Sequence, residues 1–159
     1  MTVDIIDFSG KWKRTHVGEL YDDFWKLQGH SWVKRKLAAK AHLHRTIEQS
    51  RFNVESDTQV FAGLLTISSS YPIHKSEEMA EKSRNEGNVV REEANGKVAH
   101  LVAWFDSTTK ELCLYRTFEN ETYTVLFKHK LMDYDTLHLT LTASNQNESV
   151  TTSTTYQRE

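Results

Sequence analysis

The sequence has very few of the residues that break or cross-link a polypeptide chain. Its 159 residues include one proline, six glycines and one cysteine, Cys113. A single cysteine excludes an intrachain disulfide framework and a multi-cysteine zinc site. Linkers between domains are usually rich in glycine, serine or proline, and no such stretch is present. The chain therefore predicts one domain over residues 1–159.

An excess of one charge and a long apolar run are also lacking. The 20 Lys+Arg and 22 Asp+Glu residues give a net charge of −2, unlike the strongly basic profile of a nucleic-acid-binding domain. No apolar run approaches the ~18 residues of a membrane-spanning helix. Residues 1–10, MTVDIIDFSG, lack the basic start and apolar stretch of a secretory signal. We therefore expect a cytoplasmic protein.

Known catalytic patterns are missing as well. The chain has no G-x-S-x-G elbow, no glycine-rich phosphate loop and no H-E-x-x-H pattern. The adjacent carboxylates Asp22 and Asp23 lie on a predicted helix, where neighbouring side chains point in different directions and cannot act as a facing pair. We therefore expect a protein that is not an enzyme.

The hydrophobic period changes once along the chain. Residues 20–27 and 33–41 have helical spacing, Gly29 suits the left-handed end of the first helix, and Ser31 can cap the second. Val33, Leu37 and Ala41 predict an apolar stripe on that second helix. The two segments therefore predict a pair of short amphipathic helices after a strand over residues 10–17.

Beyond about residue 42 the period is two, which is typical of β-strands. Residues 60–68, VFAGLLTIS, read as one continuous β-type run around Gly63, and Asn95-Gly96 is a hairpin signal. The clearest alternating segments are 97–105, 111–119, 122–131, 136–143 and 149–158. Their short polar links require antiparallel neighbours, because a parallel return needs a crossover of about a dozen residues. A meander that curls shut has no free edge, so we predict a mostly β, up-and-down barrel with the helix pair across one end.

Residues 76–87, SEEMAEKSRNEG, interrupt this pattern with a capping serine, acidic residues and a terminal glycine. Two interpretations are compatible with the sequence: a solvated polar helix or loop on the surface, or an extra flap over the barrel mouth. Cys113 lies between Leu112 and Leu114 and is most simply a small apolar filler. Trp12 and Trp104 are expected to be packing residues.

Both ends of the chain resemble one family. FSGKWK at 8–13, YDDFWKLQG at 21–29 and WVKRKLA at 32–38 resemble the opening of the intracellular lipid-binding proteins, the fatty-acid-binding and retinoid-binding proteins. STTYQRE at 153–159 is similar to that family's last strand, which has a tyrosine near the chain end. The resemblance implies a ten-stranded antiparallel up-and-down barrel capped by a helix-turn-helix lid. It also implies a non-enzymatic carrier of a fatty acid, retinoid or similar amphiphile, with no cofactor and no metal.

The family's ligand-binding arginines are not matched. Tyr156 matches the tyrosine of the family's R-x-Y pair, but Thr154 stands where the arginine would be, and Phe127 stands in place of a second arginine. One extra residue between Trp12 and Tyr21 is a further departure. Arg116 can supply the missing cation from another wall; alternatively it pairs with an internal glutamate or faces solvent. The candidate ligand contacts are Arg116, Tyr156, Tyr123, His129, Phe127, Phe118, Leu114, Thr154, Trp25, Phe24 and Arg14.

Further hypotheses concern partners and alternatives. The basic segment Lys34, Arg35, Lys36 and Lys40 is either a solvated helix face or a contact with anionic membranes, and the protein is expected to be a monomer. His42 and His44 share a strand face, but two histidines without a third ligand do not predict a metal site. One alternative is a barrel that has lost ligand binding and has a structural, protective or protein-interaction role. Another is an extracellular lipocalin, which the early helix pair and the absence of a leader disfavour.

Overall fold

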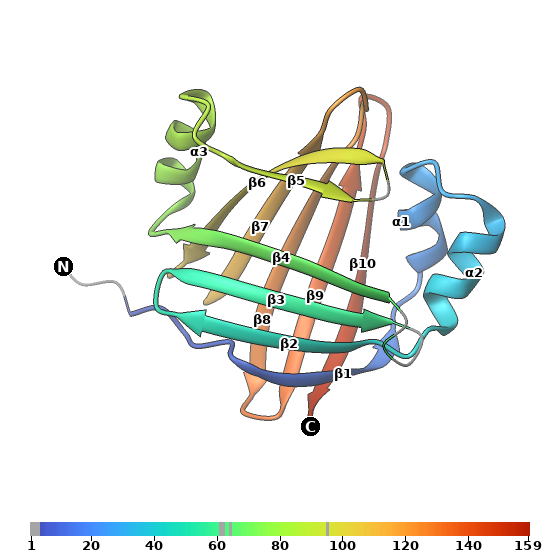
Figure 1. The fold of residues 1–159 in the computed structure, drawn as a ribbon, viewed down its shortest axis with the longest axis horizontal. Helices are drawn as coiled ribbons and strands as arrows, with labels where there is room; N and C mark the ends of the chain where they lie inside the picture. Colours follow the sequence, from blue (N-terminus) through green and yellow to red (C-terminus); the bar gives the residue numbers. More distant parts are fainter. Residues whose placement is uncertain (1–3, 61–62, 64, 95) are drawn as a thin grey trace.

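The computed structural model describes residues 4–60, 63, 65–94 and 96–159, and its elements form a β-barrel with a helix pair at one end (Figure 1). In chain order the elements are β1 (Gly10–Val17), α1 (Tyr21–Leu27), α2 (Trp32–Lys40), β2 (His44–Ser50), β3 (Asn53–Val60), β4 (Leu65–His74), α3 (Glu77–Asn85), β5 (Val90–Ala94), β6 (Lys97–Asp106), β7 (Glu111–Phe118), β8 (Thr124–Asp133), β9 (Thr136–Ser144) and β10 (Ser149–Arg158). The predicted ten-stranded barrel with a helical lid is confirmed. In the described parts of the chain, no helix has the length and hydropathy needed to cross a bilayer.

One strand pair differs from the all-antiparallel prediction. The sheet runs in the order β4-β3-β2-β1-β10-β9-β8-β7-β6-β5, and it closes through a pairing of β4 with β6. This closing pair is parallel and joins Ile73 to Ala103 and His74 to Trp104. Helix α3 and strand β5 lie between β4 and β6 in the chain and together form the crossover that a parallel pair needs. Strand β5 pairs with β6 and lies outside the closed ring.

The predicted continuous run over residues 60–68 is wrong. Strand β3 ends at Val60 and β4 begins at Leu65, and the two strands pair as a hairpin. Gly63 has φ +86 in the turn between them, a left-handed conformation that glycine adopts without a Cβ clash. Phe61, Ala62 and Leu64 lie outside the described residues, as does Asn95 of the predicted Asn95-Gly96 turn.

A β-bulge in β1 lies in the same stretch as the extra residue near the N-terminus. Arg14 pairs with Tyr156 and His16 pairs with Thr155, so two steps along β1 face one step along β10. A β-bulge inserts one residue into one strand while the pairing continues on either side. The bulge thus lies between Trp12 and Tyr21, the interval in which the sequence has its extra residue.

The two helices of the lid pack differently. Ser31 caps α2 by accepting a hydrogen bond from the Lys34 N–H, and Gly29 has φ +81 between the helices, as predicted. Helix α1 buries Tyr21 and Phe24, whereas α2 has no fully buried side chain.

The predicted apolar stripe of α2 is largely exposed, with Val33 at 58% and Leu37 at 51%, and Trp32 is 63% exposed. The reason is the position of α2, which lies outside α1 at the end of the barrel (Figure 1).

Residues 76–87 form a helix on the outer wall of the barrel. Ser76 caps α3 by accepting from the Met79 N–H. Ala80 is 1% exposed and packs with Val102, Trp104 and Cys113, which point outward from β6 and β7. The flap interpretation is therefore wrong, because α3 covers the wall and not the mouth. Burial raises the pKa of Cys113 to about 12, in accord with its expected role as an apolar filler.

The contact of α3 with the wall predicts unequal effects of one substitution on two neighbouring residues. Ala80→Glu places a carboxylate against Trp104 and Cys113, so we expect the free energy of unfolding to fall by ~1–3 kcal/mol. Met79 is 49% exposed on the same helix, so Met79→Glu is expected to change it by less than about 0.5 kcal/mol. Urea unfolding followed by tryptophan fluorescence measures both, and equal effects would contradict the packing of α3.

Candidate ligand site

Buried apolar side chains make up most of the inner wall of the barrel, and polar side chains lie among them. Trp12, Phe105 and Leu112 are fully buried at the end far from the helices, together with Phe8. Between the ends, the inward-facing side chains Arg116 and Phe127 are only partly buried. A side chain inside a close-packed core is normally fully buried. The residual accessibility therefore indicates that side chains do not fill this level of the interior.

Polar atoms without partners are concentrated on this inner wall. In the described residues, the buried side-chain atoms without a hydrogen bond include Tyr71 Oη, Arg116 Nε, His129 Nε2 and Thr154 Oγ1. They come from β4, β7, β8 and β10. A buried polar group without a partner costs ~1–3 kcal/mol. Their convergence from four strands is the arrangement expected where a molecule with polar atoms is held.

Arg116 lies inside the barrel and is paired with a glutamate. It faces Leu101 and Val125 across β6 and β8, both buried. Its Nη2 lies 3.5 Å from Glu92 Oε2 and donates a 3.4 Å hydrogen bond to Ser69 Oγ, while Ser69 Oγ donates to Glu92 Oε1 at 2.5 Å. The interpretation of Arg116 as paired with an internal glutamate is therefore correct. Burial lowers the pKa of Arg116, and Glu92 opposes that effect.

Arg14 has another role. Its Nη1 donates to Tyr21 Oη at 2.9 Å, and its Nη2 donates to the carbonyls of Ala38 and Ala41, each at 2.7 Å. These carbonyls belong to the C-terminal end of α2, where unpaired carbonyl groups favour a cation. Arg14 therefore ties the lid to β1, and its hydrogen-bonding capacity is largely used there.

His129 is neutral and its tautomer is defined by its contacts. Nδ1 lies 3.1 Å from the Leu112 carbonyl, so Nδ1 carries the proton and Nε2 is an unpaired acceptor. Burial, followed by the positive charge of Arg45, lowers the pKa of His129 well below its usual value. An uncharged imidazole cannot neutralise an anion, so its contribution to a site is a polar contact.

The remaining predicted contacts fall into two groups. Thr154, Tyr156, Leu114, Phe127 and Phe118 lie on the inner wall. Burial raises the pKa of Tyr156, so its hydroxyl is protonated at neutral pH and can donate. Tyr123, Trp25 and Phe24 lie at the helical end. There the Lys97 ammonium donates to Tyr123 Oη at 2.9 Å, and the Trp25 ring makes edge contacts with Phe24 and His30.

Four interior residues were not predicted from the sequence: Arg45, Ser69, Tyr71 and Glu92. Arg45 shares a strand face with Leu43 and Ile47, which is a signal that sequence reasoning can use. Tyr71 likewise alternates with Ile73. Glu92 and Ser69 carry no such signal, because they come together only where β5 approaches β4.

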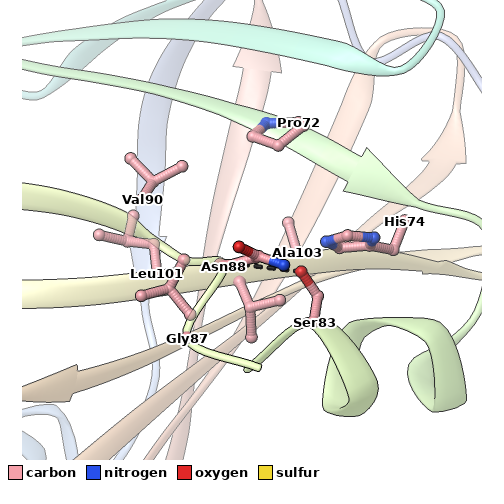
Figure 2. Close-up of a pocket in the computed structure, with 10 residues that line it drawn as sticks. Pro72, His74, Ser83, Gly87, Asn88, Val90, Leu101 and Ala103 are labelled. Atoms are coloured by element: carbon pink, nitrogen blue, oxygen red, sulfur yellow. Dashed lines mark hydrogen bonds between the residues drawn. The ribbon is translucent and has the colours of Figure 1, made fainter. Parts of the chain in front are cut away.

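A separate pocket of about 410 Å³ lies where β4 and β5 both flank β6, and its lining combines the outward-facing Val102 with Leu101 and Ala103 of the interior core (Figure 2). Pro72, His74, Asn88 and Val90 line it, and Ser83 Oγ donates to the Asn88 carbonyl at its rim. The lining contains none of the ligand contacts predicted from the sequence. The two histidines considered for metal binding lie elsewhere: His44 Nδ1 is 2.5 Å from Glu159 Oε1, and His42 is exposed.

Comparisons with known proteins give a result for structure and none for sequence. The chain matches no family model and no curated protein sequence. Among solved structures, the fatty acid transporter REP1-NXSQ is similar at 18% identity, with a TM-score of 0.72 and 96% of each chain covered. Apo lipid binding protein 8 of Caenorhabditis elegans is similar at 15% identity, with a TM-score of 0.72 over 100% of both chains.

The same fold occurs in a protein described by another property. A secretary abundant heat soluble protein from Ramazzottius varieornatus is similar at 13% identity, with a TM-score of 0.74, and 96% of this chain and 95% of that chain are covered. At these identities the comparisons establish the fold alone. This chain therefore has the helix-capped barrel of the lipid-binding proteins, as the sequence resemblance implied.

The neutral state of His129 predicts a pH dependence of stability. The folded-state pKa lies below the unfolded value of about 6.5, so below that pH the unfolded chain binds a proton that the native state does not. Stability is therefore retained above pH ~6.5 and lost on acidification, by at most about 1.4 kcal/mol per pH unit for this group. Urea unfolding between pH 7 and pH 5 is expected to show a smaller loss in His129→Gln. The exposed His42→Gln serves as the control, and equal slopes in the two variants would refute the assignment.

Proposed function

We propose that this protein is a divergent intracellular lipid-binding protein, a non-enzymatic carrier that holds a fatty acid or similar hydrophobic small molecule inside its barrel. The observation that carries the proposal is the set of buried polar atoms without partners, Tyr71 Oη, Arg116 Nε, His129 Nε2 and Thr154 Oγ1, on an inner wall that is otherwise largely apolar. The polar end of an amphiphile can form hydrogen bonds with these atoms, and its apolar chain can pack against the apolar side chains of the wall.

The energetics favour such a ligand. Burial of an alkyl chain contributes ~0.8 kcal/mol per CH₂ group. Phe127, Leu114 and Phe118 offer apolar surface for that chain along β7 and β8. The polar end of the ligand then lies among Arg116, Tyr156 and His129, with Thr154 beside them. Phe24, Trp25 and Tyr123 border the path at the helical end, and Arg14 holds the lid over it.

The proposal extends to the setting in which the carrier works. A monomeric cytoplasmic protein takes up a fatty acid or a retinoid, and its lid meets anionic membranes during exchange. Lys34, Lys36 and Lys40 lie on α2 beside the exposed Trp32 and Leu37, which suits a membrane surface. Arg35 of the same basic segment differs, because its Nε is 3.0 Å from Asp22 Oδ1 and joins the two helices.

A ligand-binding measurement tests the carrier function. The delipidated protein is expected to bind a fluorescent long-chain fatty acid at one molecule per chain. Oleic acid or retinoic acid is expected to displace this fluorescent probe. The same ligands are expected to raise the thermal unfolding midpoint, because they bind only the folded state. Absence of binding by every probe would reject the carrier and leave the structural, protective or protein-interaction role.

A transfer measurement tests the membrane contact. Charge reversal at Lys34, Lys36 and Lys40 to glutamate is expected to slow transfer of the bound probe to phosphatidylserine-containing vesicles by at least about tenfold at low salt, because each basic residue near such a surface contributes ~1 kcal/mol and a tenfold change needs only about 1.4 kcal/mol. Reversal of Lys11 and Lys13, exposed on β1, is the matched control. Transfer rates that are equal for the two variants, or independent of salt, would exclude an electrostatic contact through α2.

A further inference from the structure

Arg14, Arg45 and Arg116 lie on the inner side of the wall and differ in what neutralises them. Arg14 donates to carbonyls of α2 and to Tyr21, and Arg116 is paired with Glu92. Arg45 donates from Nε to Ser56 Oγ at 2.9 Å. Within the described residues, no carboxylate lies within 4.0 Å of Arg45, and its Nη1 and Nη2 atoms make no hydrogen bond. Arg45 is thus the interior arginine whose charge is not balanced.

The strand register places Arg45 on the inner face. It lies opposite Trp12 of β1 and Thr58 of β3, and Ile47 two residues further along β2 is buried. Its partner Ser56 is buried and lies opposite Ser69 of β4. Ser69 in turn contacts both Glu92 and Arg116. A polar band therefore crosses the inner wall from β2 to β7.

The charge of Arg45 reaches groups on three other strands. Burial is the largest influence on the pKa of Tyr71 on β4, His129 on β8 and Tyr156 on β10, and the positive charge of Arg45, which acts to lower each pKa, is the largest effect of a neighbouring charge. For both tyrosines this effect opposes the larger upward shift caused by burial, so their hydroxyls remain protonated donors at neutral pH. The guanidinium of Arg45 therefore faces the same interior as Tyr71, His129 and Tyr156.

We propose that Arg45 recognises the anionic end of the ligand, with the Tyr71 and Thr154 hydroxyls as additional donors. The ligand class is then an acyl chain that ends in a single oxyanion, such as a long-chain carboxylate. Glu92 neutralises Arg116 and so reduces its attraction for an anion. The anion is therefore bound by Arg45, on the β2 side of the barrel. An uncompensated cation in a low-dielectric interior is costly, and an anion that accepts its hydrogen bonds offsets that cost. This inference rests on the proposed carrier function.

The test compares an acid with an alcohol of the same chain. Binding of oleic acid and of oleyl alcohol is measured for the delipidated wild type, Arg45→Met, Arg116→Met and Arg45→Lys by displacement of an uncharged fluorescent probe. Loss of a charge-assisted hydrogen bond is expected to weaken binding of the acid to Arg45→Met by about tenfold or more. Binding of the alcohol is expected to change by less than about threefold. Arg116→Met is expected to lose less affinity for the acid, and Arg45→Lys to recover part of it.

The outcomes separate this inference from the carrier function. Unchanged binding of the acid by Arg45→Met, or equal loss for acid and alcohol, overturns the role of Arg45 and leaves the carrier standing. A wild type that binds neither ligand rejects both. If Arg45→Met fails to fold, oleate labelled with ¹³C at its carboxyl group is titrated in the wild type and in Arg45→Lys. A bound carboxyl pKa below that of an ordinary carboxylic acid in both supports the proposal, and an unshifted or raised value overturns it.

Discussion

The closure of one sheet on itself is the constraint on which the rest of the structure depends. The edge strands of the ten-stranded sheet are β4 and β5, and the ring closes because β4 pairs with β6, the neighbour of β5, through Ile73 with Ala103 and His74 with Trp104. Along the rest of its length, β4 approaches β5 through side chains, where Ser69 donates to Glu92. Because Glu92 also pairs with Arg116, the same carboxylate both bridges the wall and reduces the positive charge inside it. The closure of the wall and the electrostatics of the interior are therefore coupled in one contact.

Much of the fold could be predicted because its signals are local. The alternation of Leu137, Leu139 and Leu141 identifies a strand and its buried face without knowledge of any partner, and all three are buried. The Ser31 and Ser76 caps are likewise read within one turn of a helix. The parallel pair of β4 with β6 could not be predicted, because it depends on where α3 and β5 lie and not on the composition of either strand. The exposed α2 stripe has a similar cause, since α1 occupies the position against the barrel.

The candidate site was predictable only in part, for a related reason. Inward orientation follows from a two-residue period, so Arg116, Phe127 and Tyr156 were identified. Whether a charged residue is neutralised depends on contacts across strands that are distant in sequence. Arg116 and Glu92 are separated by the whole of β6 in the chain yet lie 3.5 Å apart. Arg45 also points inward, and it alternates with apolar residues in the sequence. That it lacks the partners of Arg14 and Arg116 is evident only from the contacts of all three side chains.

Polar contacts of two arginines hold the lid on the barrel, because the lid has little apolar surface buried against it. Helix α2 buries no side chain fully, so the hydrophobic effect contributes little to its position. Arg14 supplies the missing attachment through the Ala38 and Ala41 carbonyls, and Arg35 supplies a second through Asp22. Hydrogen bonds to a helix end are directional and few in number, so they can break together without exposing a core. A lid attached in this way can separate from the barrel at a smaller cost than one embedded in it, which suits the proposed passage of a ligand at this end.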